Sequence, residues 1–486
     1  MKLLIVMQHI NFFRNLDTVV REFDARGHET VMLHGTRLDD PGTKARVAAK
    51  KQKMVFMGRG IGVAEEGLAS LTTGYRPEPE EAHQQRLRTG RLVMNRGIYL
   101  RKGHPSPERT AEKGGLSPRM IQYTKSPLVR AVLRRPLALR AWRRIEAANR
   151  PSASVTSVLR DIQPDVVLVS PTVWPKKPIE ADYIHAARKL GIPTVGYLNS
   201  WDNLTSKGTV HVLPDVFVVW NEALASEAEE LHSIPRSIIR VTGAPHLDHF
   251  FESEPSLSRA QLCHQLGCPD DRPYIVYLCS SRTLIQDETH VVTRLADALA
   301  RQHPERAPMI VIRPHPVNPG PWENYDHPGT TVFPKHGDQA DTPESWQEYF
   351  NQLSGASCFV GLNTTAFLEA AVTDRPCLTI VSDEFFDQQG RTGHFRHLLA
   401  ADFLEVSADV AQVATRVGRV VDGVDEKAAW RRRFVQEFLR PRGVETSAKS
   451  VVADTIEALV PEARASVAPQ DVQPDEPVVL AAREGS

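Results

Sequence analysis

The chain has 486 residues, enough for two domains that each bury a core, because a typical domain has about 150 residues. Hydrophobic residues make up 41% and charged residues 24%, which is ordinary globular composition and excludes a mainly disordered chain or a coiled coil. The chain has 59 basic residues (Lys and Arg) and 59 acidic residues (Asp and Glu). Because there is no excess of positive charge, we expect no nucleic-acid partner.

Cysteine content and hydropathy indicate a cytoplasmic protein. Five cysteines are few for this length, and their spacing favours free thiols over a metal site or disulfides. No run approaches the 18 apolar residues that a membrane span needs. The apolar run at residues 2–8 is too short for a signal peptide, so we interpret it as a buried strand.

Apolar runs alternate with helical patterns along the first 250 residues. Residues 2–8 are followed by apolar residues at helical spacing, and Gly27 then ends that helix. This order of strand, loop, helix and strand is the beginning of a parallel sheet. The further strands that we expect lie at residues 30–33, 165–169, 193–197, 215–219 and 238–241.

A second alternating series begins after a junction near residues 250–257. We expect a strand at 274–278, a helix at 289–301, and further strands at 309–312, 358–361 and 377–381. The fold class that follows is α/β, with two successive halves.

Two regions interrupt this alternation. Residues 39–125 are polar and weakly periodic, and we interpret them as an insertion of helices and loops. Residues 119–150 hold nine Lys and Arg against one Glu, interleaved with leucines. One interpretation is a basic amphipathic surface that binds anionic lipid or an anionic acceptor. The other is a solvated helical face, whose apolar stripe belongs to the core. The last residues, 461–486, read as a flexible tail.

Polar loops that follow the strands are the places to look for a site, because ligands of open α/β sheets bind beyond the carboxyl ends of strands. In the first half, His9 could act as a general base and Arg14 could hold an anion. Asp202 is a second candidate base, with Asn199 and Asn203 as orienting groups. The structural alternatives are a histidine that caps the next helix and a self-capped turn.

Two loops of the second half carry candidate phosphate ligands. Ser281 and Arg282 follow the strand at 274–278, although a serine-rich helix cap explains them as well. In the sequence Arg-Pro-His-Pro, two prolines fix the backbone around His315, and Arg313 adds a charge. A buried structural histidine is the alternative.

A third group of candidates lies at residues 361–389. Asn363 or Thr364 would cap a helix whose amides attract phosphate, and Thr365 adjoins them. Glu369, about one turn inside that helix, can accept hydrogen bonds from both ribose hydroxyls. The later pair Asp387 and Gln388 suits sugar hydroxyls, and a surface loop is the alternative there.

Taken in this order, these loops resemble those of nucleotide-sugar-dependent glycosyltransferases of the GT-B fold, over most of residues 1–40 and 160–460. Residues 361–376 look like the donor-nucleotide helix, with Glu369 at the ribose position. The Arg-Pro-His-Pro sequence resembles the His-Pro motif of bacterial sialyltransferases, Kdo transferases and CDP-glycerol glycerophosphotransferases, which contacts the nucleotide. Asp387 and Gln388 resemble the acidic-Gln pair that holds the donor sugar in UDP-glycosyltransferases.

The resemblance implies two Rossmann-like domains with a cleft between them. Their expected bounds are 1–250 for the acceptor side, with a helical insertion at about 39–160, and 258–425 for the nucleotide-sugar side. Helices at 426–460 would pack back on the first domain.

The implied reaction is metal-independent transfer of a sugar from a nucleotide-sugar donor to a carbohydrate or lipid-linked acceptor in surface-polysaccharide or glycolipid synthesis. His9 or Asp202 would be the base, and we expect no cofactor. The alternatives are a glycerophosphotransferase, a nucleotide-sugar 2-epimerase, or a non-catalytic protein that binds nucleotide sugars. A peripheral position on the inner face of an anionic membrane would follow if residues 119–150 bind lipid.

Overall fold

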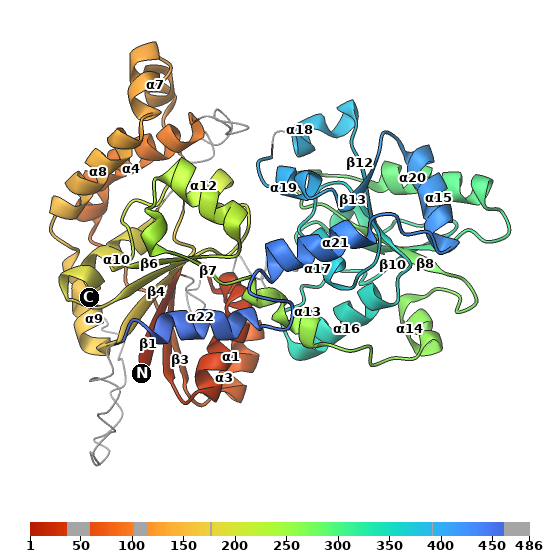
Figure 1. Cartoon of the computed structure of the whole chain (residues 1–486), viewed down its shortest axis with the longest axis horizontal. Helices are drawn as coiled ribbons and strands as arrows, with labels where there is room; N and C mark the ends of the chain where they lie inside the picture. The colour runs from red at the N-terminus through yellow and green to blue at the C-terminus, as the bar shows by residue number, and fades with distance from the viewer. Residues whose placement is uncertain (36–58, 102–114, 175–176, 391, 461–486) are drawn as a thin grey trace, which may run out of the picture.

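The structure is a computed structural model that describes residues 1–35, 59–101, 115–174, 177–390 and 392–460. Two α/β halves lie side by side, each built around a parallel sheet (Figure 1). The predicted class, α/β with two Rossmann-like domains, is confirmed. The expected flexible tail at 461–486 lies outside the described residues.

The first half contains a parallel sheet with the strand order β3-β2-β1-β4-β5-β6-β7 in the described residues. Successive side chains of β1 enter opposite cores: Leu3 and Ile5 pack on one face, Leu4 and Val6 on the other. Burial on both faces explains the continuous apolar runs in the sequence. The strands are β1 (Lys2–Met7), β2 (Glu29–His34), β3 (Leu71–Tyr75), β4 (Val166–Ser170), β5 (Thr194–Tyr197), β6 (Val216–Val219) and β7 (Ile239–Val241).

Helices cover both faces of this sheet. On one face α1 packs through Val19, Val20 and Phe23, and on the other α9 and α10 pack through residues such as Leu159 and Ile184. The elements around the sheet are η1 (Ile10–Asn15), α1 (Asp17–Ala25), α3 (Arg59–Gly67), α9 (Ala153–Ile162), α10 (Ile179–Lys189), α11 (Asn203–Ser206), α12 (Glu222–His232), η2 (Arg236–Ile238), η3 (Pro245–Leu247) and α13 (Asp248–Glu252).

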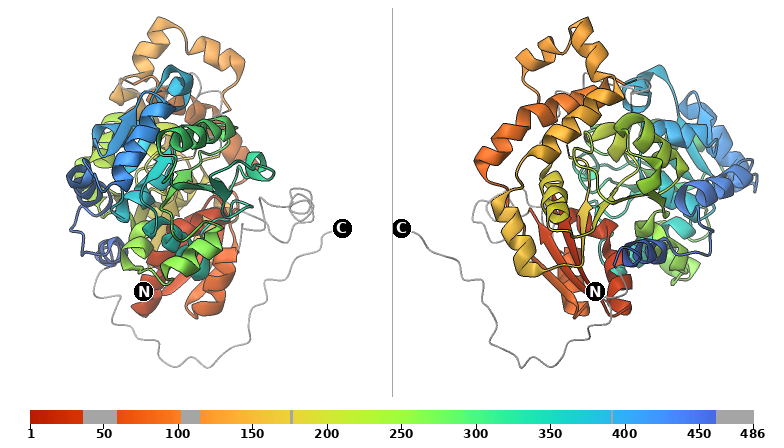
Figure 2. Two further views of the ribbon diagram at one scale, coloured as in Figure 1. Left: turned by 90° about the vertical axis from the view of Figure 1, so that its right-hand side faces the viewer. Right: turned by 60° about the vertical axis from the view of Figure 1, so that its left-hand side comes forward.

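Between β3 and α9 the chain forms a helical extension of the first half. It consists of α4 (Glu81–Tyr99), α6 (Pro118–Tyr123), α7 (Pro127–Leu133) and α8 (Pro136–Ala148). In Figure 1 and in both views of Figure 2, the orange helix α7 projects away from the two sheets.

The second half contains a parallel sheet with the order β10-β9-β8-β11-β12-β13 in the described residues. Tyr274 and Val276 of β8 face one core, whereas Ile275 and Tyr277 face the other. The strands are β8 (Tyr274–Leu278), β9 (Met309–Arg313), β10 (Thr330–Val332), β11 (Phe359–Gly361), β12 (Cys377–Ile380) and β13 (Leu404–Ser407).

The helices of the second half again lie on both faces of the sheet. One core includes α15 and α20, and the other includes α14, α16 and α17. The elements are α14 (Arg259–Leu266), α15 (Thr289–Gln302), η4 (Gly320–Trp322), α16 (Pro343–Ser354), α17 (Ala366–Val372), η5 (Asp383–Phe385), α18 (Phe386–Gln389), α19 (Phe395–Ala400), α20 (Val410–Val421), α21 (Ala428–Phe434) and η6 (Val435–Leu439). They are followed by α22 (Ala448–Glu457), which packs on the first half.

The strands expected from apolar runs are all present, and three strands escaped prediction. In the described residues these are β3 and β10, which are short and partly exposed, and β13, whose buried positions include Glu405 and Ser407, so none of them has a continuous apolar run. Because β3 pairs with β2 in parallel, the region from residue 39 to 125 is not composed of helices and loops alone, as we had expected.

The last described helix, α22, returns to the first half. Val452, Ala453 and Ile456 of α22 enter the same core as α1, and Arg26 pairs with Asp454 at 2.7 Å. We expected residues 426–460 as a whole to pack there. Instead α21 stays with the second half, where the buried Arg431 pairs with Asp374 at 2.8 Å and Asp425 at 2.7 Å. The chain between α21 and α22 also contacts the first half, where Asn221 donates to the carbonyl oxygen of Phe438 at 2.9 Å and Arg440 pairs with Asp248 at 2.6 Å.

Candidate active site

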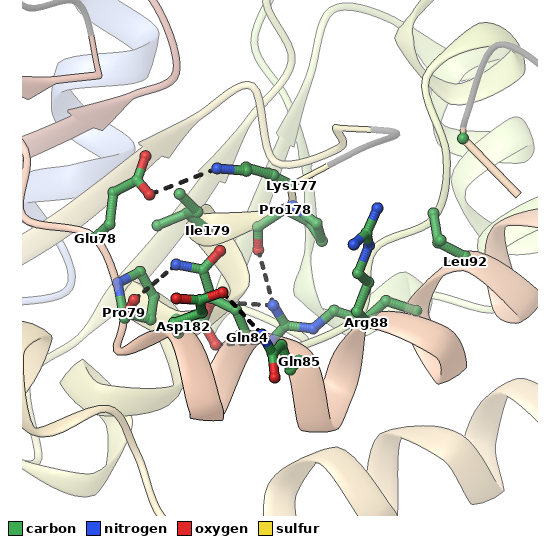
Figure 3. A pocket seen from close by; sticks show the side chains of 13 residues that line it. Glu78, Pro79, Gln84, Gln85, Arg88, Leu92, Lys177, Pro178, Ile179 and Asp182 are labelled. Atoms are coloured by element: carbon green, nitrogen blue, oxygen red, sulfur yellow. Dashed lines mark hydrogen bonds and ion pairs between the residues drawn. The ribbon is translucent and has the colours of Figure 1, made fainter.

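One cavity, of about 680 Å³, lies in the first half beside α4 and α10 (Figure 3). Two ion pairs lie in it: Lys177 lies 3.7 Å from Glu78, and Arg91 lies 2.6 Å from Asp182. The lining of this cavity comes from the first half alone. A second pocket is lined by residues of both halves.

The interdomain pocket lies at the carboxyl edge of the second sheet. Leu278 and Arg313 end β8 and β9, and Thr364 and Thr365 connect β11 to α17. This is the edge at which open α/β sheets bind ligands. Its lining comprises Arg14, Leu278, Cys279, Arg313, Pro314, His315, Pro316, Asp338, Gln339, Ala340, Trp346, Tyr349, Thr364, Thr365, Ala366 and Glu369.

Glu369 is held in place by a neighbouring phenol. Tyr349 donates a hydrogen bond of 2.6 Å from its hydroxyl to Oε2 of Glu369. The other oxygen, Oε1, forms no hydrogen bond with the described residues. A carboxylate with one oxygen fixed and one open toward a pocket can accept hydrogen bonds from ligand hydroxyl groups.

Arg313 is fixed by the same phenol ring. Its guanidinium lies 3.7 Å from the ring centroid of Tyr349, and its Nη1 donates to Oε1 of Gln352 at 2.6 Å. Burial lowers the pKa of Arg313. A cation that is partly removed from water interacts more strongly with an anion, so this guanidinium is suited to a phosphate.

His315 is held in one tautomer by the backbone. The amide of Val317 donates to Nδ1 of His315 at 3.2 Å, so the proton of the neutral ring lies on Nε2. The flanking Pro314 and Pro316 restrict the backbone. Gly337 packs against this turn at φ +64°, and a Cβ there would lie 3.2 Å from the carbonyl oxygen of His315.

Arg14 is the residue that the first half contributes to this pocket. With its amide oxygen facing Arg14, Gln339 accepts hydrogen bonds from Nε at 3.2 Å and from Nη1 at 2.8 Å. Because Arg14 belongs to the first half, the sequence predicts it on the acceptor side, together with Asn199 and Asn203. The structure places it in the pocket with Arg313 and His315, because η1 reaches across to the loop at 338–340. Two guanidinium groups and an imidazole therefore surround one space.

Four donor-site candidates of the second half do not line this pocket. Ser281 shares a hydrogen bond of 3.0 Å with Thr283, and Arg282 is exposed. Asp387 is exposed at the start of α18, and Gln388 is half-buried beside it.

Asn363 also lies outside the pocket, because its amide is used within the protein. Its Nδ2 donates to the carbonyl of Gln388 at 2.6 Å and to Thr392 at 3.0 Å. Asn363 therefore connects the loop before α17 to the loop after α18.

The loop after β5 is closed by its own hydrogen bonds. Oδ1 of Asn203 accepts from the backbone amides of Asn199 at 3.1 Å and Ser200 at 3.3 Å. Asp202 accepts from Ser206 at 2.7 Å and lies 3.8 Å from Lys207. Lys207 and these hydrogen bonds outweigh burial and lower the pKa of Asp202 to about 2. A carboxylate that is so stable as an anion is a poor general base.

His9 lies at the carboxyl edge of the first sheet, outside the pocket lining. Its ring contacts Trp174 and Phe12, with centroid distances of 5.5 and 5.9 Å. Burial, and secondarily the charge of Arg76, lower the pKa of His9, so the imidazole is neutral near pH 7. Its side chain does not cap η1. A neutral imidazole is the form in which histidine accepts a proton.

Sequence reasoning missed the aromatic side chains of the pocket. Trp346 and Tyr349 lie on α16, which begins where Thr342 accepts from the backbone amide of Ser345 at 3.3 Å. The pattern of an amphipathic helix predicts that such aromatic residues belong to the hydrophobic core, and Tyr349 is indeed buried. They line the pocket because α16 packs beside the end of β9, where Arg313 contacts the ring of Tyr349.

No protein-family model and no curated protein matches the chain by sequence. Among solved structures, the chain is similar to a Listeria monocytogenes protein assigned as a UDP-N-acetylglucosamine 2-epimerase. The identity is 11%, the TM-score 0.54, and the coverage 97% of this chain and 99% of that one. A similar likeness holds for the UDP-GlcNAc 2-epimerase of Neisseria meningitidis, with 13% identity, a TM-score of 0.50, and coverage of 94% and 100%.

The chain has the GT-B fold. At these identities the likeness concerns the fold. In the described part of the chain, no helix has the length and apolar character to cross a bilayer. Nor do three or more His, Cys, Asp or Glu side chains gather there as a metal site.

Proposed function

We propose that this protein is a nucleotide-sugar-dependent enzyme that transfers a sugar to an acceptor hydroxyl group. The observation that carries the proposal is the interdomain pocket in which Arg14, Arg313, His315 and Glu369 meet. A nucleoside diphosphate presents two kinds of group, anionic oxygens and ribose hydroxyls. The pocket offers cations and an N–H donor for the anionic oxygens, and a carboxylate for the ribose hydroxyls.

In the proposed reaction, the second half holds the donor and the first half holds the acceptor. Arg313 and Arg14 stabilise the charge that develops on the departing diphosphate, and Nε2–H of His315 donates to it. His9, neutral at the edge of the first sheet, removes the proton of the acceptor hydroxyl group as the new glycosidic bond forms. The acceptor that we propose is a carbohydrate or a lipid-linked carbohydrate.

A nucleotide-sugar 2-epimerase is the second candidate, and the solved structures support it equally well. Both similar proteins described above carry that name, and the Neisseria meningitidis enzyme was solved with UDP-GlcNAc bound. The two reactions differ in their need for an acceptor. An epimerase interconverts its nucleotide sugar alone, whereas a transferase releases the nucleotide only when an acceptor is present.

The first test is nucleotide binding. We expect at least one of UDP, CDP and GDP to bind in calorimetry, and Glu369→Ala to weaken that binding by about 1–3 kcal/mol, the range for a lost hydrogen bond to a charged group. Glu384→Ala is the matched control, since Glu384 is an exposed carboxylate of the same half that pairs with His290 at 3.0 Å. Equal affinity of Glu369→Ala and the unmodified protein, both folded, contradicts the proposed pocket.

The second test separates the two candidate reactions. The nucleotide sugar that binds is incubated with and without hydroxyl acceptors, and the products are identified by NMR. Release of nucleotide that depends on an acceptor supports transfer. Formation of the 2-epimer without an acceptor supports the epimerase instead.

A further inference from the structure

The arm formed by α6, α7 and α8, residues 118–148, exposes large apolar side chains to an unusual degree. The five most exposed large hydrophobic residues in the described part of the chain all lie on it, with 57% to 80% of each exposed. The next, Phe386 elsewhere in the chain, is 56% exposed. The five residues of the arm are Tyr123, Leu128, Val132, Leu137 and Ile145.

These side chains are separate from those that attach the arm to the protein. Leu139 of α8 is buried against Ile98 and Tyr99 of α4. The buried Arg143 donates to the carbonyl oxygen of Val210 at 2.8 Å and to that of His232 at 2.7 Å. The inner side of α8 is therefore packed and hydrogen-bonded, and the outer apolar side chains are not needed for attachment.

The outer side of α8 has the pattern of an interfacial helix. Leu137, Ala141 and Ile145 are spaced by four residues and exposed, so they lie on one face. Arg140 and Arg144 are exposed beside them. In α7, Leu128 and Val132 have the same spacing.

The charge of the arm is of one sign. Seven basic side chains of the arm form no ion pair with any described residue: Arg119, Lys125, Arg130, Arg134, Arg135, Arg140 and Arg144. The acid of this segment, Glu146, is buried and bonded to Arg91. Since the whole chain carries no net charge, the excess of cations is local to the arm.

We propose that the arm binds the surface of an anionic phospholipid bilayer. Its leucine, valine and isoleucine side chains enter the boundary between headgroups and acyl chains, and its arginines contact lipid phosphates. This combination requires a partner that is both anionic and apolar. Helices of this kind lie in the plane of a membrane and do not cross it.

Two other occupants fit these observations less well. Single-stranded nucleic acid is bound through aromatic stacking, and the exposed residues here are mostly aliphatic. A symmetric dimer through the arm would place two basic surfaces against each other, and like charges repel.

The test is sedimentation of the full-length protein with vesicles. Vesicles of phosphatidylcholine with about 30% phosphatidylglycerol are compared with pure phosphatidylcholine, at about 50 and about 500 mM salt. We expect binding to the anionic vesicles that falls at high salt. Leu128→Ser with Leu137→Ser, and separately Arg135→Glu with Arg140→Glu, should each lower the partition coefficient by about tenfold or more.

Matched controls change exposed residues elsewhere, namely Leu399→Ser and Arg301→Glu, and should bind like the unmodified protein. Circular dichroism verifies that each variant is folded. Absence of vesicle binding, equal binding to neutral and anionic vesicles, or normal binding by both arm variants overturns the proposal. Light scattering that shows a dimer lost in the arm variants, without vesicle binding, would assign the arm to self-association.

Discussion

The carboxyl edges of the two sheets use polar side chains in opposite ways. At the first edge, Arg76 is buried between Gln8 and Glu180, at 3.0 Å from each. At the second edge, Arg313 and Glu369 contact the same phenol and still line an open pocket. Two copies of one fold thus place charges at equivalent edges. The first copy uses them mainly to complete its own packing, and the second leaves them available for a ligand.

His9 is the exception at the closed edge, and its removal should have the largest effect. Its side chain forms no hydrogen bond with the described residues, unlike that of Asp202. If His9 is the base, His9→Ala lowers the rate of transfer by about 10²–10⁴ while donor affinity in calorimetry stays nearly constant. Asp202→Asn is the comparison. A normal rate in His9→Ala with no activity in Asp202→Asn would reverse the two roles.

Arg76→Met should destabilise the first half by about 3–5 kcal/mol, because it leaves the carboxylate of Glu180 buried without its cation. Burial raises the pKa of Glu180 to about 7. The loss should therefore be larger at pH 8 than at pH 5, where Glu180 is protonated and neutral. Urea unfolding at both pH values measures the difference.

The matched variant for this experiment is Arg76→Met combined with Glu180→Met. Removing both partners of a buried pair costs much less than removing one, so the double variant should recover most of the lost stability. If the single variant unfolds like the unmodified protein, the first edge is not closed by this pair.

Glu288→Gln tests a closed site within the second half and should have the smallest effect. Glu288 accepts from the amide and the hydroxyl of Ser280, both at 2.8 Å, and burial raises its pKa to about 7. The folded protein therefore holds a proton that the unfolded chain releases near pH 4.5. Stability from Glu288 is present below pH 4.5 and is lost as the pH rises through 7, by up to about 3 kcal/mol.

Glutamine imitates the protonated acid, so the variant should lack this part of the pH dependence. Thermal melting of both proteins from pH 5 to pH 8 measures it. Parallel pH profiles of the two proteins would show that Glu288 titrates normally.

The sequence predicts the strands of this fold better than it predicts the site. Strands buried on both faces appear as continuous apolar runs, whereas β10, which is partly exposed throughout, has no such signal. In the site, Arg313 and His315 were recognisable because they end a predicted strand and are flanked by prolines. The positions of Trp346 and Tyr349 depend on the packing of α16, which no local pattern specifies.

Local hydrogen bonding limits such predictions further. Asn363 and Asn203 have the composition of ligand-binding loops, and both instead bond to their own loops and neighbours. A short polar side chain that closes a turn and one that holds a ligand occur in similar sequences. The sequence likewise does not predict that the side chain of Arg14 points into this pocket, because its partner Gln339 is more than 300 residues away in the chain.

The packing of α22 on the first half has a consequence for folding while the chain is being synthesised. Val452, Ala453 and Ile456 complete the core beneath α1, yet they follow the whole second half in the sequence. The first half is synthesised first, and the apolar surface beneath its helix α1 therefore stays uncovered until the second half has also been made. A segment that ends at residue 250 lacks α22 and keeps that surface exposed, so the first half needs a helix from beyond the second half to complete its core.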